Sequence, residues 1–217
     1  MGIYILRHGQ TDLNVERKLQ GRLDIPLNET GIRQAEQLAE IVRQQGLLFS
    51  KVIASPLDRA LTTGEIVTGR PRETFWIDSR LAEMDFGELE GVRYMDLPGE
   101  KKKFFTDPGN FVPMEGHESM NDLVAREKDF FEDLRFEAEE ASVSGENILL
   151  LSHGTTIHAM LVYLRGKAMK DFWDEDVHNC DMLIVDYVDG EYIVRPERIG
   201  IMKEWNFLSP VDNSGKK

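Results

Sequence analysis

The chain of 217 residues suits one large domain or two small ones, and its formal net charge of −13 argues against nucleic acid and anionic membranes as partners. A single cysteine, Cys180, excludes an internal disulfide and a cysteine zinc cluster and favours a reducing cytoplasm. No apolar run reaches the length of a membrane span, and no signal peptide is recognisable.

The first predicted element is a buried strand at residues 3–6, where four apolar residues follow one another. Arg7, His8 and Gly9 come next, at the end of a strand where open α/β sheets place ligand crevices, which predicts an anion site. A neutral imidazole can attack phosphorus with one ring nitrogen while the other donates to a carbonyl. The arginine fork matches phosphate oxygens, and the glycine lets the backbone approach a phosphate. By themselves these residues fit a hydrogen-bonded core histidine equally well.

A polar loop or short helical turn is predicted at residues 11–28, where glycine and proline interrupt regular structure. A loop of this length in a compact domain is often functional. Asn14, Gln20 and the Gly21 amide are candidate donors to phosphate oxygens, although each residue alone is more often a turn former.

A helix, a strand and a second helix are predicted next, at residues 31–45, 51–54 and 56–67. Ser55 is the expected N-cap of the second helix, with proline at its first position. Arg59 then falls in the first turn of a helix that follows a strand, near a helix N-terminus that favours anions. A surface salt bridge is the alternative for this arginine.

The middle of the chain is predicted to contain a strand at residues 74–77, an acidic loop at 81–91 and a cap region at about 92–118. One acid of the loop could donate a proton to a leaving oxygen. The cap would set specificity. The lysine run 101–103 is better explained as a solvated face than as a substrate clamp. Packing under the cap is the favoured role of three phenylalanines, Phe104, Phe105 and Phe111.

A long helix is predicted from residue 118 to about 140, followed by a buried strand at 147–152. His153 and Gly154 come directly after this strand and before a helix at 155–164, which repeats the pattern at the start of the chain. Two histidines at two strand ends are hard to explain as core packing. Asp189-Gly190 then predicts a hairpin between 182–187 and 192–194, and residues 209–217 are predicted to be a polar tail.

Four groups of residues occur in an order and spacing that together resemble the histidine phosphatase superfamily, also called phosphoglycerate mutase-like. The resemblance covers about residues 3–195 and is carried by Leu6-Arg7-His8-Gly9-Gln10-Thr11, Ser55-Pro56-Leu57-Asp58-Arg59-Ala60, Glu83 with Glu90-Gly91, and Leu151-Ser152-His153-Gly154. Gln10 stands where the family often has Glu, and His117 replaces a glycine in a Gly-Glu-Ser-like motif. The opening looks most like that of broad-specificity bacterial phosphatases.

The resemblance implies an α/β fold with a mostly parallel central sheet, helices on both faces and a helical cap insertion, in one domain over residues 1–208. It implies a metal-independent phosphomonoester hydrolase without a cofactor, acting on a small phosphorylated metabolite through a phosphohistidine. His8 would be the nucleophile and Glu83 the general acid and base. The phosphoryl group would be held by Arg7, Asn14, Gln20, Gly21, Arg59, His153 and Gly154.

Two other functions stay open at this point. A phosphoglycerate mutase would transfer the phosphoryl group back to its substrate, but the short separation of Glu83 and His153 is similar to the phosphatase-type cap. A non-catalytic phospho-ligand binding protein is less expected, since such relatives usually lose a catalytic histidine or arginine. The identity of the phosphoester and the oligomeric state are not predicted.

Overall fold

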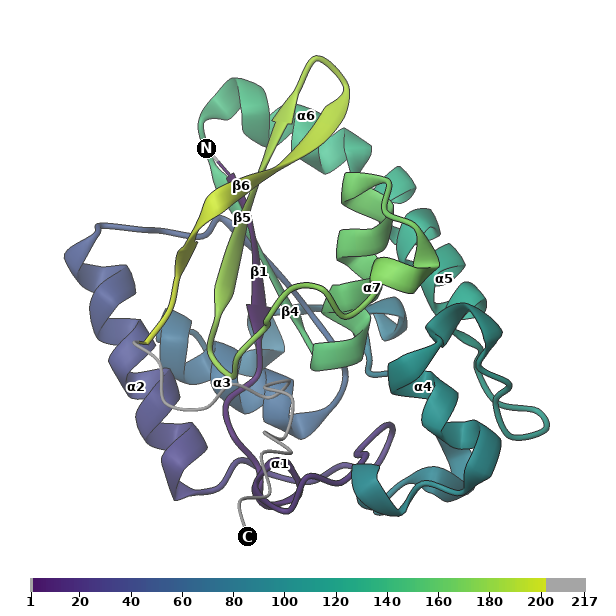
Figure 1. The fold of residues 1–217 in the computed structure, drawn as a ribbon. Helices are drawn as coiled ribbons and strands as arrows, with labels where there is room; N and C mark the ends of the chain where they lie inside the picture. The colour runs from purple at the N-terminus through teal and green to yellow at the C-terminus, as the bar shows by residue number, and fades with distance from the viewer. Residues whose placement is uncertain (1, 202–217) are drawn as a thin grey trace, which may run out of the picture.

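A computed structural model describes residues 2–201 of the chain, and the predicted tail at 209–217 lies outside these residues (Figure 1). Its centre is a six-stranded sheet with the strand order β3-β2-β4-β1-β5-β6. The strands are β1 (Gly2–Arg7), β2 (Lys51–Ala54), β3 (Trp76–Ile77), β4 (Asn147–Ser152), β5 (Met182–Val188) and β6 (Glu191–Ile199). The four strands from β3 to β1 are parallel, and β5 runs antiparallel to β1 and to β6. The predicted mostly parallel α/β sheet is confirmed.

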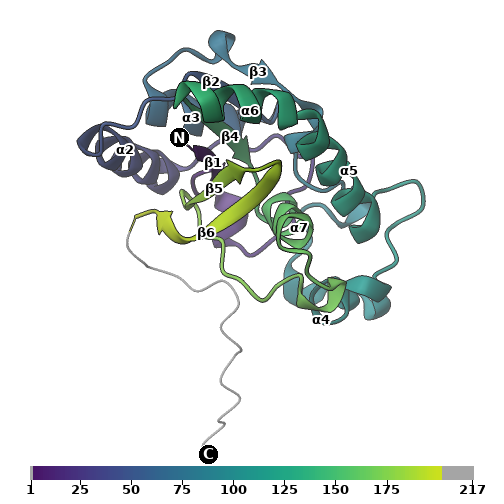
Figure 2. The same cartoon turned by 90° about the horizontal axis from the view of Figure 1, so that it is seen from above.

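Strand β1 is apolar throughout because both faces of the sheet are covered. Ile3 and Ile5 point into a core shared with three helices, α5 (Met120–Asp133), α6 (Arg135–Ser144) and α7 (Gly154–Arg165). Tyr4 and Leu6 point into the core on the other face, where α2 (Glu29–Gln44) and α3 (Asp58–Thr68) pack. Figures 1 and 2 show α2 and α7 on opposite sides of the strands. Such two-sided burial is what a continuous apolar strand requires.

The cap region consists of short helical pieces over a third apolar core. These are η4 (Tyr94–Asp96), η5 (Gly99–Lys102), α4 (Lys103–Thr106) and η6 (Pro108–Asn110). Phe104 and Phe111 are buried in this core, as the packing interpretation expected. The lysine run also has a structural role, since Lys101 binds the carbonyls of Val112 and Pro113. In Figure 1, α4 lies towards the end of the sheet to which β1 points.

Two helix predictions are wrong in detail. The second helix begins at Asp58, with Leu57 rather than Ser55 as its N-cap. The Ser55 hydroxyl accepts from the Leu57 amide over 3.3 Å and also binds within the site described below. The predicted helix 118–140 is two helices, α5 and α6, that meet at the buried Leu134. Helix α5 packs on α7 whereas α6 packs on the strands, and the break between them allows both contacts.

Other elements agree with their predictions apart from their ends. The strand expected at 74–77 is reduced to β3, because residues 72–74 form a 3₁₀ turn, η1 (Arg72–Thr74), and β3 is an exposed edge. The hairpin is present, with φ of 52° at Asp189 and 85° at Gly190, as a two-residue turn of this type requires. Among the described residues, no helix combines the length and apolar character needed to cross a membrane.

Candidate active site

The two motif histidines meet because they follow neighbouring strands. Arg7 pairs with Ser152 in the parallel register of β1 and β4, and the His8 amide continues the ladder by donating to the Ser152 carbonyl over 3.1 Å. The ring centroids of His8 and His153 lie 5.0 Å apart. The carboxyl edge of the sheet therefore brings together residues that are far apart in sequence, as expected.

The tautomer of His8 follows from its hydrogen bond. Its Nδ1 lies 2.7 Å from the carbonyl oxygen of Gly9, which can only accept, so Nδ1 carries the proton and donates. Burial lowers the pKa of His8 well below its ordinary value, and the charges of Arg59 and Arg7 lower it further. The ring is thus neutral, with the lone pair on Nε2, which is the form a nucleophile needs.

Arg59 is fully buried at the start of α3 and is held by three acceptors. Its Nη1 and Nη2 donate to the carbonyls of Leu23 and Gly21 over 2.7 and 2.8 Å, and its Nε donates to His153 Nδ1 over 3.1 Å. Burial lowers the pKa of Arg59 to about 10, so the guanidinium remains charged at neutral pH. The surface salt bridge considered from the sequence is excluded by this burial.

His153 is the partner of Arg59 and of Ser55. Because Nδ1 accepts from Arg59, the proton is on Nε2, which donates to the Ser55 hydroxyl over 2.6 Å. Burial and the Arg59 charge lower the pKa of His153 well below its ordinary value, so this imidazole is also neutral. Both ring nitrogens are engaged by protein groups.

Arg7 and the segment opposite it form the next part of the floor. The Arg7 Nη1 donates to the Val177 carbonyl over 2.5 Å, and burial lowers the pKa of this arginine. His158 of α7 lies against the same segment, with its ring nitrogens 2.7 and 2.9 Å from the carbonyl oxygens of Gly154 and Glu175. Burial lowers the pKa of His158, and the neutral ring donates to one of the two. A Cβ on Gly154 would lie 3.3 Å from the Arg7 guanidinium carbon, so a larger residue there would press on this guanidinium.

Glu83 is placed by the N-terminus of α7. Its Oε2 accepts from the amide of Thr155, and its Oε1 accepts from the amides of Thr156 and Met84 and from the Thr156 hydroxyl, all over 2.9–3.1 Å. Helix N-termini favour carboxylates because their first amides have no partner within the helix. The buried carboxylate is therefore fixed in position at the wall of the cavity.

Thr11 orients both Asn14 and Gln20, since its backbone amide donates to Asn14 Oδ1 over 3.1 Å and its hydroxyl donates to Gln20. The Thr11 Oγ1 lies 2.8 Å from Gln20 Oε1 and 3.2 Å from Asn14 Oδ1, and it is completely buried. Asn179 donates to the same Asn14 oxygen over 3.4 Å and to the His8 carbonyl over 2.9 Å. Since both amide oxygens face Thr11, the two NH₂ groups, which donate to none of the described residues, are turned towards the cavity that Asn14 and Gln20 line.

Two glycines have roles that differ from expectation. A Cβ on Gly9 would lie 2.6 Å from the Gly31 carbonyl oxygen, so a larger residue at position 9 would collide with the start of α2. Gly21 has φ of +53°, and a Cβ there would lie 2.0 Å from Glu90 Oε1. Gly21 contributes its carbonyl to Arg59 and is not among the described residues that line the cavity.

These residues line a cavity that is open to solvent and measures about 640 Å³ with the solvent at its mouth included. Seven predicted residues line it: Arg7, His8, Asn14, Gln20, Arg59, Glu83 and Gly154. His153 and Gly21 lie behind this surface, in contact with Arg59. Sequence reasoning missed Ser55 as a partner of His153, Thr155 and Thr156 as donors to Glu83, and Asn179. Ser55 lies within a recognised motif and could have been found, whereas Asn179 carries no signal in the sequence.

The charged groups at the cavity floor are guanidiniums rather than metal ligands. Within residues 2–201, no group of three or more His, Cys, Asp and Glu side chains could hold a metal ion. The planar forks of the guanidiniums fit the oxygens of a tetrahedral oxyanion. A neutral histidine, two arginines, two amide groups and a carboxylate thus surround one space.

Comparisons with known proteins identify the family of the chain. The chain is 34% identical to the broad-specificity phosphatase YOR283W of Saccharomyces cerevisiae, covering 91% of this chain and 84% of that protein. It is 31% identical to the probable phosphoglycerate mutase GpmB of Proteus mirabilis, covering 88% and 87%. The phosphoserine phosphatase of Entamoeba histolytica, solved as a mutant in complex with phosphoserine, has the same fold, with a TM-score of 0.77 at 24% identity over 91% of this chain and 96% of that one. Residues 3–197 match the family model of the histidine phosphatase superfamily (branch 1), and the chain belongs to this family, as its motifs predicted.

Proposed function

We propose that this protein is a phosphatase that hydrolyses small phosphomonoesters through a phosphohistidine on His8. The observation that carries the proposal is the hydrogen bond from His8 Nδ1 to the Gly9 carbonyl, which leaves the Nε2 lone pair at a cavity floor that Arg7 and Arg59 make positive. Phosphoryl transfer depends mainly on positioning and charge stabilisation, and this set of residues supplies both.

In the first step, His8 Nε2 forms a bond to phosphorus as the ester P–O bond breaks. The guanidiniums of Arg7 and Arg59 stabilise the negative charge on the phosphoryl oxygens, and the Asn14 and Gln20 amides donate to the same oxygens. Glu83, a carboxylate in the free protein, takes the proton of the bound phosphate monoanion and gives it to the leaving oxygen, so that the alcohol departs neutral.

In the second step, water attacks the phosphorus of phosphohistidine. Glu83, again a carboxylate, takes one proton from this water and passes it to the phosphate product, and the N–P electrons return to His8 Nε2. The products are inorganic phosphate and neutral histidine. His153 and Ser55 keep Arg59 oriented through both steps, because Arg59 Nε donates to His153 and His153 donates to Ser55.

The test is a steady-state assay with an aryl phosphate in the presence of EDTA, combined with trapping of radiolabelled protein in an alkaline detergent quench, because phosphohistidine survives alkali and is lost in acid. The wild type should turn over and carry an acid-labile label. His8→Ala should lose both, with kcat/KM falling by at least about 1,000-fold. The matched control is His178→Ala, whose histidine does not line the cavity and should leave both readouts unchanged. Full activity in His8→Ala would refute the role of this residue.

A phosphoglycerate mutase is the second candidate, and the identity to GpmB is the observation that favours it. A mutase passes the phosphoryl group to a second hydroxyl of its substrate instead of water. Phosphoglycerate interconversion that outpaces phosphate release would therefore establish it. Binding of phosphorylated ligands without any turnover would point instead to a non-catalytic role. We also propose a reducing, cytoplasmic setting, because the buried Cys180 is the chain's only cysteine.

A further inference from the structure

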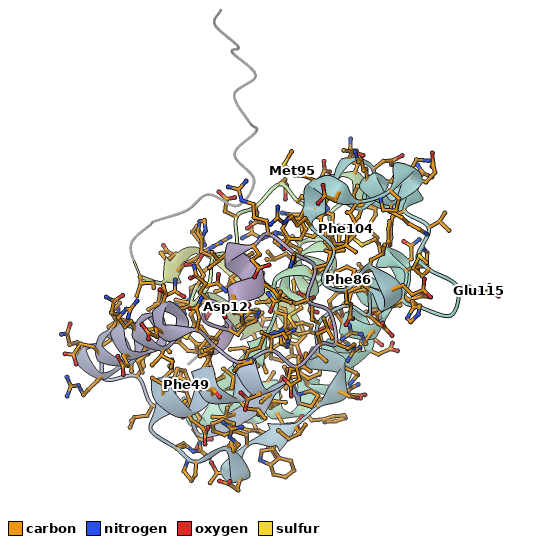
Figure 3. The ribbon with its side chains drawn as sticks, turned by 90° about the horizontal axis from the view of Figure 1, so that it is seen from below. Asp12, Phe49, Phe86, Met95, Phe104 and Glu115 are labelled. Carbon is orange, nitrogen blue, oxygen red and sulfur yellow. The ribbon has the colours of Figure 1, made fainter. Side chains whose placement is uncertain are left out.

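The cavity has two chemically different ends. Its floor carries the charged and amide groups described above, whereas its outer wall is aromatic. Five side chains of residues 86–105 and of the segment after α7 form what we call the aromatic wall: Phe86, Tyr94, Phe104, Phe105 and Trp173. Figure 3 labels Phe86 and Phe104, which lie next to each other on the cap side of the molecule.

The aromatic wall is a packed surface rather than a set of separate rings. Phe105 lies 4.6 Å from Phe104, 5.1 Å from Tyr94 and 5.5 Å from Trp173, measured between ring centroids. The Trp173 indole donates to the Phe104 carbonyl over 2.7 Å, which fixes one side of the wall to α4. A rigid apolar surface of this kind binds a flat apolar group without first having to order itself.

Positive charge is confined to the floor. Among the described residues that line the cavity, Arg7 and Arg59 are the only lysines or arginines. The nearby cap lysines are directed elsewhere, since Lys101 binds backbone carbonyls and Lys103 pairs with Glu100. A substrate carboxylate placed against the aromatic wall would lose water and gain no cation, which is costly.

The acidic side chains at the rim do not change this conclusion. Glu175 pairs with Lys167 and Arg198, so its charge is balanced by residues behind it. Asp176 lines the cavity with an exposed side chain and adds negative charge at the opening. An anionic leaving group would meet repulsion there as well as an apolar wall.

We propose that the preferred substrates are phosphomonoesters of uncharged, flat, apolar alcohols, such as aryl or benzylic alcohols; this inference rests on the proposed phosphatase function. Esters whose alcohol carries a carboxylate, such as phosphoglycerates, are disfavoured. The floor recognises the phosphate, and the aromatic wall selects the group attached to it.

The decisive measurement is the binding affinity of two phosphonates. The enzyme cannot hydrolyse these compounds, so their affinities report on the aromatic wall independently of turnover. Isothermal titration with benzylphosphonate and 2-carboxyethylphosphonate compares an aryl group with a carboxylate. We expect benzylphosphonate to bind at least about tenfold more tightly, and the corresponding esters to differ by about 100-fold in kcat/KM. Equal or tighter binding of the carboxylate compound would overturn the inference.

Variants at Phe105 test the wall itself, because this side chain is only half-buried and its replacement spares the buried Phe104. Phe105→Ala should weaken benzylphosphonate binding by about tenfold, and Phe105→Arg should invert the preference by supplying a cation for the carboxylate. Phe136→Ala, the same change at a side chain that is 81% exposed on α6, should alter neither affinity. If Phe105→Arg still preferred benzylphosphonate to 2-carboxyethylphosphonate as the wild type does, the aromatic wall would not be what selects the substrate.

The two proposals fail in distinguishable ways. If benzylphosphonate binds preferentially but no ester is hydrolysed, the substrate selection stands and the phosphatase function does not. If esters are hydrolysed but phosphoglycerate is preferred, the phosphatase function stands and the inference is overturned.

Discussion

Replacing Thr11 by valine tests whether one buried hydroxyl positions the phosphate-binding amide of Gln20. Valine has nearly the same shape, so the packing around this fully buried residue is kept while the hydroxyl is lost. The change removes the 2.8 Å bond to Gln20 Oε1 and the 3.2 Å contact with Asn14 Oδ1. The Gln20 amide is then free to rotate and to present its oxygen, instead of its NH₂ group, to the phosphoryl oxygens, whereas Asn14 Oδ1 keeps its bonds from the Thr11 backbone amide and from Asn179.

The expected loss follows from the value of a hydrogen bond to a charged group. Such a bond contributes about 1.5–3 kcal/mol, so losing one correctly oriented amide in the transition state lowers kcat/KM by roughly 10- to 150-fold. Stability should fall by only about 1 kcal/mol, the usual effect of losing an N-cap, because Thr11 also caps α1 (Asp12–Val15).

The assay is kcat/KM for 1-naphthyl phosphate together with the inhibition constant of inorganic phosphate, which contacts only the floor. In Thr11→Val, kcat/KM should fall and the inhibition constant of phosphate should rise. Both should return towards the wild-type values in Thr11→Ser, which restores the hydroxyl. Thermal unfolding separates a stability effect from a positioning effect. The reasoning is refuted if Thr11→Val stays within about twofold of the wild type, or if Thr11→Ser is as impaired as Thr11→Val.

Three further variants test other parts of the site and the core. Glu83→Gln should lower kcat/KM, which reports the first step, by about 100-fold for an alkyl phosphate but by less than about tenfold for 4-nitrophenyl phosphate, since nitrophenolate leaves without a proton. Equal losses would exclude Glu83 as the general acid. Ser55→Ala removes the acceptor of His153 and should reduce kcat/KM by about tenfold; because the buried His153 Nε2–H then has no partner, the free energy of unfolding should also fall by about 1–3 kcal/mol. Burial raises the pKa of Glu127 well above its ordinary value, against the Arg126 charge, and its Oε2 has no partner among the described residues. A carboxyl whose pKa is raised in the folded state makes the wild type less stable as pH rises above about 4.5. Glu127→Gln removes this titration, so its free energy of unfolding should exceed that of the wild type by about 1 kcal/mol at pH about 7.5 and equal it near pH about 4.5. Urea unfolding at the two pH values measures the difference.

The sequence was most informative where one element dictates the position of a residue. A buried apolar strand followed by Arg7-His8, and a second one followed by His153, predicts that the imidazoles share a sheet edge. The 5.0 Å separation of their rings confirms it. The start of α3 places Arg59 by the same logic. In each case the position of the residue is set by local sequence and by the general topology of parallel sheets.

Prediction was weaker where a hydrogen bond between distant residues decides the geometry. Ser55 matches an N-cap pattern locally, yet its hydroxyl binds His153, which is 98 positions away. Asn179 reaches the His8 carbonyl across 171 positions. The break at Leu134 has no proline or glycine to mark it and follows from packing on different partners. Such choices depend on tertiary contacts, which periodicity and capping signals do not contain.

The bonds of the arginines explain how a chain with a net charge of −13 can bind an anion. Arg72 pairs with Asp58 and Glu65, so its charge is cancelled by carboxylates. Arg59, next to Asp58 in sequence, donates to two carbonyls and a neutral imidazole instead. Neutral acceptors fix the guanidinium without cancelling its charge, and burial removes the water that would screen it. The floor therefore remains positive for a phosphate although the surface is acidic.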